Sequence, residues 1–199
     1  MKKLMLTLVG LLAFGILAGY GIGWYMQQGK QSTKRLPIVV EAVLPSRSVE
    51  LYFADPQGGY LQPELRQIPG CEEDRDCISA LLQELIGGPQ QGGLPVLPKS
   101  ARVFAVELEN DLVRVNFSRH LVDLHPGGSL SELLTVYSLV NSLAENFSYL
   151  RQLQILIDGE ILPTLKGHVR IDQPIYADFR YSRPPLTGPA AQSGASNKQ

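Results

Sequence analysis

The chain has 199 residues, with 18 lysines and arginines against 19 aspartates and glutamates, and 44% of its residues are hydrophobic. A net charge of −1 excludes a bulk electrostatic attraction to nucleic acid, which needs a basic excess clustered on one face. Two cysteines are too few for a disulfide-dense scaffold or a four-cysteine zinc site. The length predicts one domain or two small ones.

An uncharged run from Leu4 to Met26 follows Lys2 and Lys3. As a helix this run would be about 35 Å long, enough to cross a hydrocarbon core of about 30 Å. A secretory signal peptide has a shorter apolar region of about 7–15 residues, so we expect an uncleaved anchor, with cleavage at the glycine-rich stretch 19–23 as the alternative.

Only three residues precede the run, and this favours a cytoplasmic N-terminus and a body on the extracytoplasmic side of the plasma or inner membrane. The predicted organisation is a single-pass membrane protein whose polar, proline-containing tether leads to one α+β domain and a disordered tail. The predicted boundaries are 1–3 for the cytoplasmic start, 4–26 for the anchor, 27–47 for the tether, 48–181 for the domain and 182–199 for the tail.

Hydrophobic periodicity predicts the first half of the domain. Residues 49–53 alternate as a strand, and a second strand over 60–68 follows a turn and is weakened by Pro63. Apolar residues then recur at helical spacing from Ile78 to Leu85, and glycines at 87 and 88 end that helix.

The second half repeats the order of strands and helix. Phe104, Val106 and Leu108 alternate, and the pair 110–111 connects them to a strand over 112–117. Ser129 and Glu132 have the spacing of a capping box at the start of a second helix.

Residues 153–157 alternate again, a turn at 158–159 leads into 160–162, and a short strand is expected within 169–176. This order predicts an α+β fold, a mixed or antiparallel sheet with two helices on one face, preceded by an N-terminal transmembrane helix.

The domain resembles the GerMN domain, a family named for sporulation and spore germination. The matching segments run in order along the chain and are Val49-Glu50-Leu51-Tyr52-Phe53, Arg66, Leu81-Leu82 with Leu85 and Gly88-Pro89, Leu97-Pro98, Val113 to Ser118, Gly128-Ser129 with Glu132, Ile157-Asp158-Gly159, and Gly167-His168. The resemblance implies a structural partner in the assembly of an envelope apparatus, with no catalytic residues to transfer. The best-known member of the family has two such domains in tandem, and this chain departs from that pattern by having one.

Two clusters invite a chemical hypothesis. Cys71 and Cys77 lie just before the first helix of the domain, and outside the cytoplasm they are expected to form a disulfide, with two free thiols as the alternative. His120, Asp123 and His125 resemble metal ligands, but they lie beside a glycine-rich loop without a further ligand pair, so no metal site is predicted.

Carboxylates and tyrosines offer no catalytic pattern either. Glu132 is assigned to its capping box, His168 to a structural contact, and no nucleophile or nucleotide motif occurs. Tyr52, Tyr60 and Tyr181 are expected to be exposed, where aromatic side chains mark interfaces.

The sequence therefore predicts a non-enzymatic, membrane-anchored envelope module without a cofactor. We expect it to act through a protein partner or self-association and not through nucleic acid. A peptidoglycan-binding module is the first alternative, and a wall-modifying enzyme is the second.

Overall fold

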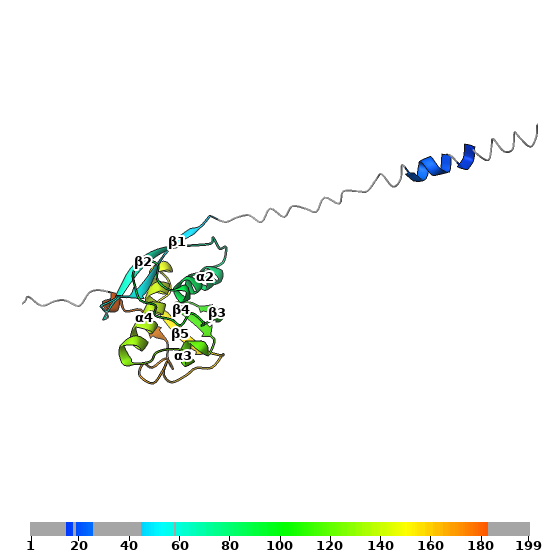
Figure 1. Cartoon of the computed structure of the whole chain (residues 1–199). Coiled ribbons are helices and arrows are strands. Elements are labelled where there is room, and N and C mark those ends of the chain that lie inside the picture. The colour runs from blue at the N-terminus through cyan, green and yellow to red at the C-terminus, as the bar shows by residue number, and fades with distance from the viewer. Residues whose placement is uncertain (1–14, 18, 26–44, 58, 183–199) are drawn as a thin grey trace, which may run out of the picture. The chain divides into compact units, whose positions relative to one another are not determined.

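The computed structural model describes residues 15–17, 19–25, 45–57 and 59–182 (Figure 1). The chain has two units, residues 1–42 and 43–199. In the first unit, residues 15–17 and 19–25 are helical. No helix among the described residues is long and apolar enough to cross a membrane. Much of the predicted anchor, and nearly all of the predicted tether and tail, lie outside those residues.

The second unit contains strands and helices in an alternating order. They are β1 (Arg47–Ala54), β2 (Leu61–Ile68), α2 (Asp74–Gly87), β3 (Val103–Glu109), β4 (Leu112–Phe117), α3 (His120–Asp123), α4 (Ser129–Asn146), β5 (Gln152–Ile157), β6 (Ile175–Tyr176) and the 3-10 helix η1 (Phe179–Ser182). The α+β class is confirmed.

The strands form two sheets. β1 and β2 pair antiparallel as a two-stranded sheet, and the other four form a mixed sheet in the order β3-β4-β5-β6. β3 and β4 are joined by the expected two-residue turn, in which Asn110 has a positive φ of 53°. β4 and β5 run parallel, so the chain between them crosses over through α4, as parallel neighbours require.

One continuous hydrophobic core joins the two sheets through the helices. β1 buries Leu51 and Phe53 on the side of α2, whose own stripe includes Leu81 and Leu85. β4 contributes Val115 from the four-stranded sheet. The alternation of the strands and the helical spacing therefore point their apolar residues at the same core.

The prediction of a single sheet is wrong, and α4 explains why. Ser138 donates its hydroxyl to the carbonyl of Tyr52 at 2.5 Å, and the Ser142 hydroxyl accepts from the Tyr52 N–H at 3.0 Å. The side chain of Asn146 binds both backbone groups of Glu50, at 2.9 and 2.7 Å. These side chains occupy the edge of β1 that another strand would use, so the two sheets remain separate.

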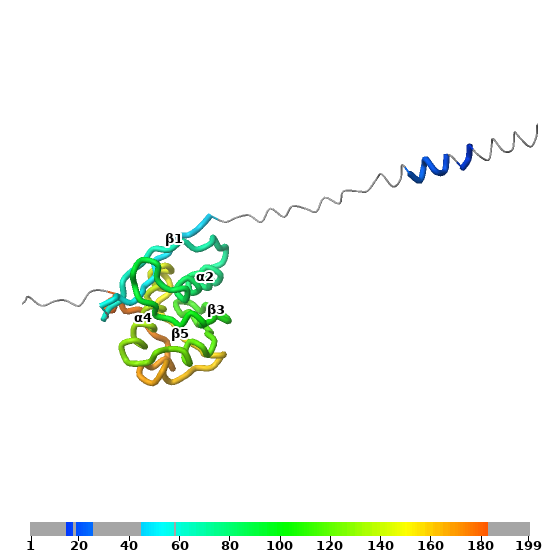
Figure 2. The backbone as a smooth tube through the Cα atoms, viewed as in Figure 1, coloured from blue at the N-terminus to red at the C-terminus, as the bar shows by residue number. Residues whose placement is uncertain are grey.

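The chain after β5 only partly follows the prediction. Asp158 and Gly159 form the expected turn with positive φ values of 51° and 83°. Only Glu160 then pairs back, with Ile157 in an isolated bridge, so residues 160–162 are not a strand. Figure 2 shows the following segment in orange, folded over one end of the domain before the short β6.

Candidate functional site

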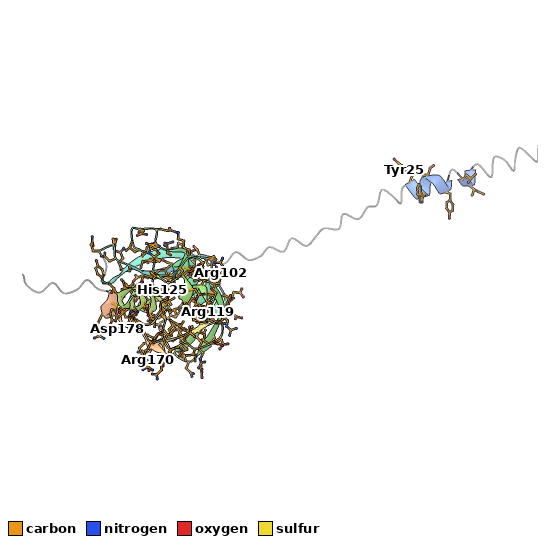
Figure 3. All side chains as sticks on the ribbon, turned by 60° about the horizontal axis from the view of Figure 1, so that its bottom comes forward. Tyr25, Arg102, Arg119, His125, Arg170 and Asp178 are labelled. Carbon is orange, nitrogen blue, oxygen red and sulfur yellow. A yellow bond between two sulfur atoms is a disulfide. The ribbon has the colours of Figure 1, made fainter. Side chains whose placement is uncertain are left out.

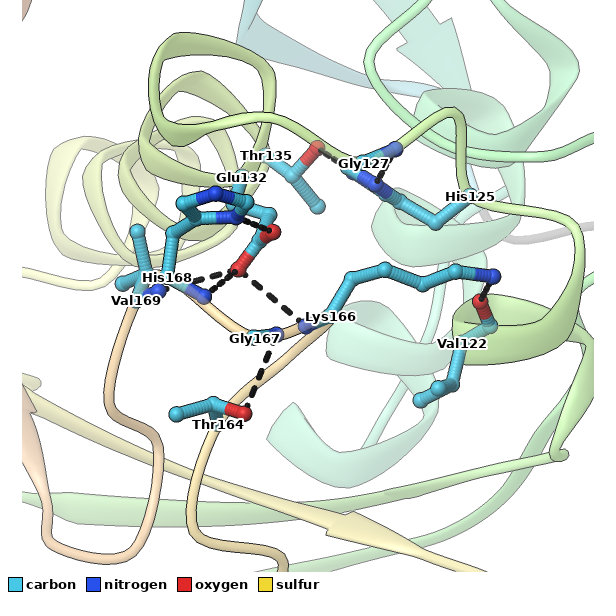
Figure 4. A network of polar contacts seen from close by, with 10 residues as sticks. All are labelled: Val122, His125, Gly127, Glu132, Thr135, Thr164, Lys166, Gly167, His168 and Val169. Carbon is cyan, nitrogen blue, oxygen red and sulfur yellow. Dashed lines mark hydrogen bonds and ion pairs between the residues drawn. The ribbon is translucent and has the colours of Figure 1, made fainter.

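The most concentrated polar network of the domain surrounds Glu132 on α4 (Figure 4). Its carboxylate is completely buried, with 0% of the residue exposed. One oxygen accepts the backbone N–H groups of Lys166, His168 and Val169 at 3.1, 3.0 and 2.9 Å. The other oxygen lies 2.7 Å from Nδ1 of His168. The buried charge is thus surrounded by donors from one loop.

Two opposing effects set the acidity of Glu132. Burial alone raises the pKa of a carboxyl group, because it disfavours the charged form. The hydrogen bonds from Val169, His168 and Lys166 outweigh burial and lower the pKa to about 2. A buried anion that accepts four hydrogen bonds is a poor proton acceptor. The expectation that Glu132 caps α4 is wrong, because Gly128 is the N-cap and no side chain caps the helix.

The loop that Glu132 holds also contacts α3. The ammonium of Lys166 donates to the carbonyls of Val122 and Asp123, at 2.6 and 2.8 Å, at the C-terminal end of that helix. A cation at this end satisfies carbonyl groups that the helix leaves free. The segment 164–169 therefore joins the end of α3 to the start of α4, which agrees with the structural contact expected for His168.

A buried ion pair lies on β2 of the two-stranded sheet. Arg66 and Glu64 on β2 are both buried and form a salt bridge. Glu64 accepts the backbone N–H groups of Gln90 and Gln91, and Arg66 donates to the carbonyl of Gly88 at 2.7 Å. This network fixes the loop after α2, where Gly88 has a positive φ of 89°. Arg66 and Gly88, both among the residues that resemble the GerMN domain, are thus joined by a hydrogen bond between β2 and the loop after α2.

The histidine and aspartate cluster does not converge. His125 is buried, its Nε2 lies 2.9 Å from the hydroxyl of Thr135, and its Nδ1 accepts the N–H of Gly127 at 2.9 Å. Because the Thr135 hydroxyl donates to the carbonyl of Val96, the hydrogen on this imidazole is on Nε2. Asp123 pairs instead with Arg119. In the described part of the chain, no three potential ligand residues come together to hold a metal.

The two cysteines lie at the start of α2. Their sulfur atoms are joined in a disulfide, with the Cα atoms 5.4 Å apart. Cys77 is in the first turn of α2, so the bridge closes the short segment that leads into this helix. The guanidinium of Arg47, at the start of β1, contacts the Cys77 sulfur at 3.7 Å. The disulfide therefore lies beside the start of β1, the first strand of the domain.

The exposed aromatic residues differ from those expected. Tyr52 is buried, at 6% exposed, and packs edge to face on Phe179. Tyr181 is half-buried and stacks on Tyr137, with 4.2 Å between the ring centres. Tyr60 is also only partly exposed. Other large apolar side chains are exposed instead, and some of them lie on edge strands.

Large apolar side chains are exposed on three such strands. Leu65 on β2 is 63% exposed, Phe104 on β3 is 59% exposed, and Tyr176 on β6 is 63% exposed. Phe104 belongs to the predicted alternating face, but a bulge between Val103 and Ala105 disrupts the alternation and turns it outward.

Two shallow grooves lie beside these strands. The larger, of about 520 Å³, lies between the end of α2 and the start of β3 and includes Lys99 and Arg102. Arg102 lies at the surface of the domain (Figure 3). A groove of about 350 Å³ lies beside Arg151 and Tyr176. Both combine apolar walls with exposed cations, an arrangement that suits contact with a macromolecule more than enclosure of a small substrate.

The sequence model of the Germane family, described as sporulation and spore germination, matches residues 50–163, more than half of the chain. The chain belongs to the Germane family. A comparison with curated protein sequences gives no match.

Solved structures of this family share the fold. The first GerMN domain of the sporulation protein GerM from Bacillus subtilis is 24% identical, with a TM-score of 0.53 over 66% of this chain and 96% of that one. The tandem GerMN domains of the same protein are 14% identical, with a TM-score of 0.53 over 75% of this chain. This chain covers 51% of the tandem protein, about half of its length.

Proposed function

We propose that this Germane-family chain is a membrane-anchored module of the cell envelope that acts by contact with another protein and not as an enzyme. One observation carries the proposal. Within the described residues, every buried polar side-chain atom has a hydrogen-bond partner, while large apolar side chains remain exposed on edge strands. The polar groups are used to hold the fold, and the edge strands are available for association.

The interior argues against catalysis. Three carboxylates are buried in the part of the chain that the structure describes: Asp55, Glu64 and Glu132. Asp55 accepts the backbone N–H of Gln57, while Glu64 and Glu132 each accept hydrogen bonds from backbone N–H groups and from a basic side chain. The pKa of Glu64, like that of Glu132, lies below its ordinary value; burial opposes the shift, and the hydrogen bonds from Gln90, Gln91 and Arg66 outweigh it. A general acid at neutral pH needs a raised pKa, so neither group suits that role.

Anchoring supports the same function. The uncharged run 4–26 supplies a span, and a module held at a membrane meets partners on that surface at a high effective concentration. The extracytoplasmic side suits a disulfide between Cys71 and Cys77. Extraction of membranes at alkaline pH tests the anchor: we expect the full chain to stay in the membrane fraction, whereas release would refute anchoring.

Crosslinking and wall binding together test the function. A lysine-reactive crosslinker applied to intact cells is expected to give discrete species that contain the chain and a second protein. Purified sacculi incubated with the full chain in mild detergent are expected neither to bind it nor to release fragments. Saturable binding to sacculi would favour the peptidoglycan-binding alternative, and release of fragments would show a wall-modifying enzyme.

A further inference from the structure

β3 is an edge strand whose outer side has no neighbouring strand in the described domain. It pairs only with β4, at one end of the four-stranded sheet. Since hydrogen bonds alternate along an antiparallel pair, every second residue of β3 points its N–H and C=O away from β4. Phe104, which has no partner in the register, is exposed on this strand. β3 thus offers the backbone groups on which another strand could pair.

The larger groove runs beside the start of this strand. Its apolar wall includes Ile86 from the last turn of α2, and Ala101 and Val103 at the start of β3. α2 packs against β3, so a strand added at this edge would have one side chain directed at the groove between them. The groove therefore lies where it would contact a side chain of an added strand, in addition to the backbone hydrogen bonds along β3.

Charge changes sign between the segment just before β3 and the far end of β3. Lys99 and Arg102 are exposed in the groove, and neither forms an ion pair with any residue that the structure describes. The Arg102 guanidinium donates only to the neighbouring carbonyl of Ala101, at 3.3 Å. Glu107 and Glu109 are exposed toward the other end of the strand. Glu109 already pairs with Arg114 of β4, so a complementary strand would carry acid over the cations and base beside Glu107.

We propose that the partner presents an extended segment that adds to the free edge of β3, with an apolar side chain in the groove and a carboxylate beside Lys99 and Arg102. This inference rests on the proposed function and specifies its partner chemistry. The two unpaired cations favour an acidic strand over a neutral one, and the apolar wall with the exposed Phe104 favours a strand that also carries apolar residues.

Short fluorescent peptides test this recognition. The probes are capped seven-residue peptides in which valine and threonine alternate, with aspartates at one end and lysine at the other, made in both orders. Binding to the full chain in mild detergent is followed by anisotropy. We expect peptides of one order to bind. We expect K99E/R102E to weaken that binding about tenfold, because each exposed charge pair contributes a fraction of a kcal/mol, and charge reversal replaces an attraction by a repulsion of similar size.

The matched control reverses two other exposed cations. R75E/R119E changes the net charge by the same amount, and both positions lie outside the two grooves, so binding is expected to stay within about twofold. Equal weakening by both double variants would show a nonspecific charge effect and overturn the proposal. A probe in which the aspartates are replaced by lysines is expected not to bind.

Methylated probes keep the test independent of the variants' folding. Methylation of the backbone nitrogens that face β3 is expected to abolish binding, whereas methylation of the alternate nitrogens is expected to leave it largely intact, since an edge strand pairs through every second residue. Loss of binding with both sets of methylated peptides, or with neither set, would overturn strand addition. Vesicles of anionic lipid that bind through Lys99 and Arg102, with no peptide binding, would assign the groove to a membrane surface instead. Failure of the peptides alongside a crosslinked protein partner would refute this inference and leave the proposed function standing.

Discussion

Replacing Glu132 by glutamine tests whether the network on α4 holds the domain together. Glutamine keeps the shape of the side chain and one oxygen that can accept the three backbone N–H groups, but it removes the negative charge. We expect the Glu132→Gln variant to fold and to unfold more easily than the native chain at neutral pH.

The magnitude follows from the acidity of the buried carboxyl. Its pKa falls from 4.5 to about 2 on folding. Since each tenfold change in proton affinity is worth about 1.4 kcal/mol, the charge stabilises the fold by about 3 kcal/mol at pH 7. A lowered pKa gives stability that is complete above about pH 4.5 and is lost as the pH falls toward 2. At pH 3 about half of it remains.

Urea unfolding of the full chain in mild detergent measures this difference. The only tryptophan, Trp24, lies outside the domain, so near-ultraviolet circular dichroism of tyrosines such as the stacked Tyr137 and Tyr181 is the appropriate signal. Glu160→Gln, an exposed carboxylate at a turn, serves as the control and is expected to change little. A Glu132→Gln loss below about 0.5 kcal/mol, or one that stays constant between pH 7 and pH 3, would refute the reasoning.

Three further predictions concern the disulfide, the ion pair of Arg66 with Glu64, and His125. Serine at both Cys71 and Cys77 is expected to lower the free energy of unfolding by about 2 kcal/mol, as closure of so short a loop implies, and thiol titration of the native chain is expected to find no free cysteine. Arg66→Leu is expected to cost about 3–5 kcal/mol in urea unfolding because it leaves the carboxylate of Glu64 buried without its cation, and a second change, Glu64→Leu, is expected to recover part of the loss. Burial lowers the pKa of His125, so the unfolded chain takes up a proton there at a higher pH than the native chain does. The native chain is therefore expected to lose stability as the pH falls below about 6.5, and His125→Gln is expected to lose less.

Local patterns in the sequence predict most of the secondary structure. The strands over 49–53 and 112–117 are found because their apolar residues alternate, and the two-residue turn at 110–111 is found because asparagine tolerates positive φ. The helices that become α2 and α4 are found because their apolar residues recur at helical spacing. These signals lie within a few residues of one another.

The arrangement of the sheets depends on contacts far apart in the chain. Ser138, Ser142 and Asn146 read as ordinary polar residues of a helix, yet they bind the backbone of β1 about 90 residues earlier. Their spacing in the sequence does not indicate that they bind the backbone of β1, so the sequence predicts a single sheet. The contacts of Glu132 with the loop at 166–169 also lie beyond the reach of a local pattern, at a separation of 34 to 37 residues, which explains why the nearby Ser129 suggests a capping box instead.

The surface was the hardest part to predict. A bulge shifts one residue of β3 out of register, and an alternating pattern assigns Phe104 to the core because it contains no sign of that shift. Among the tyrosines expected on the surface, Tyr52 packs against Phe179 of η1, and Tyr181 of η1 itself stacks on Tyr137. Exposure of a single aromatic side chain thus depends on tertiary contacts that a local pattern does not contain.

Association with a second protein through the edge of β3 is tested by a photo-crosslinking amino acid at position 104 of the full chain, in the membranes of intact cells. The same substitution at Glu160, an exposed residue that lies on none of the edge strands, is the control. The account predicts a discrete crosslinked species containing a second protein from position 104 and none from position 160. The same crosslinks from both positions, or none from position 104, would contradict association through the edge of β3.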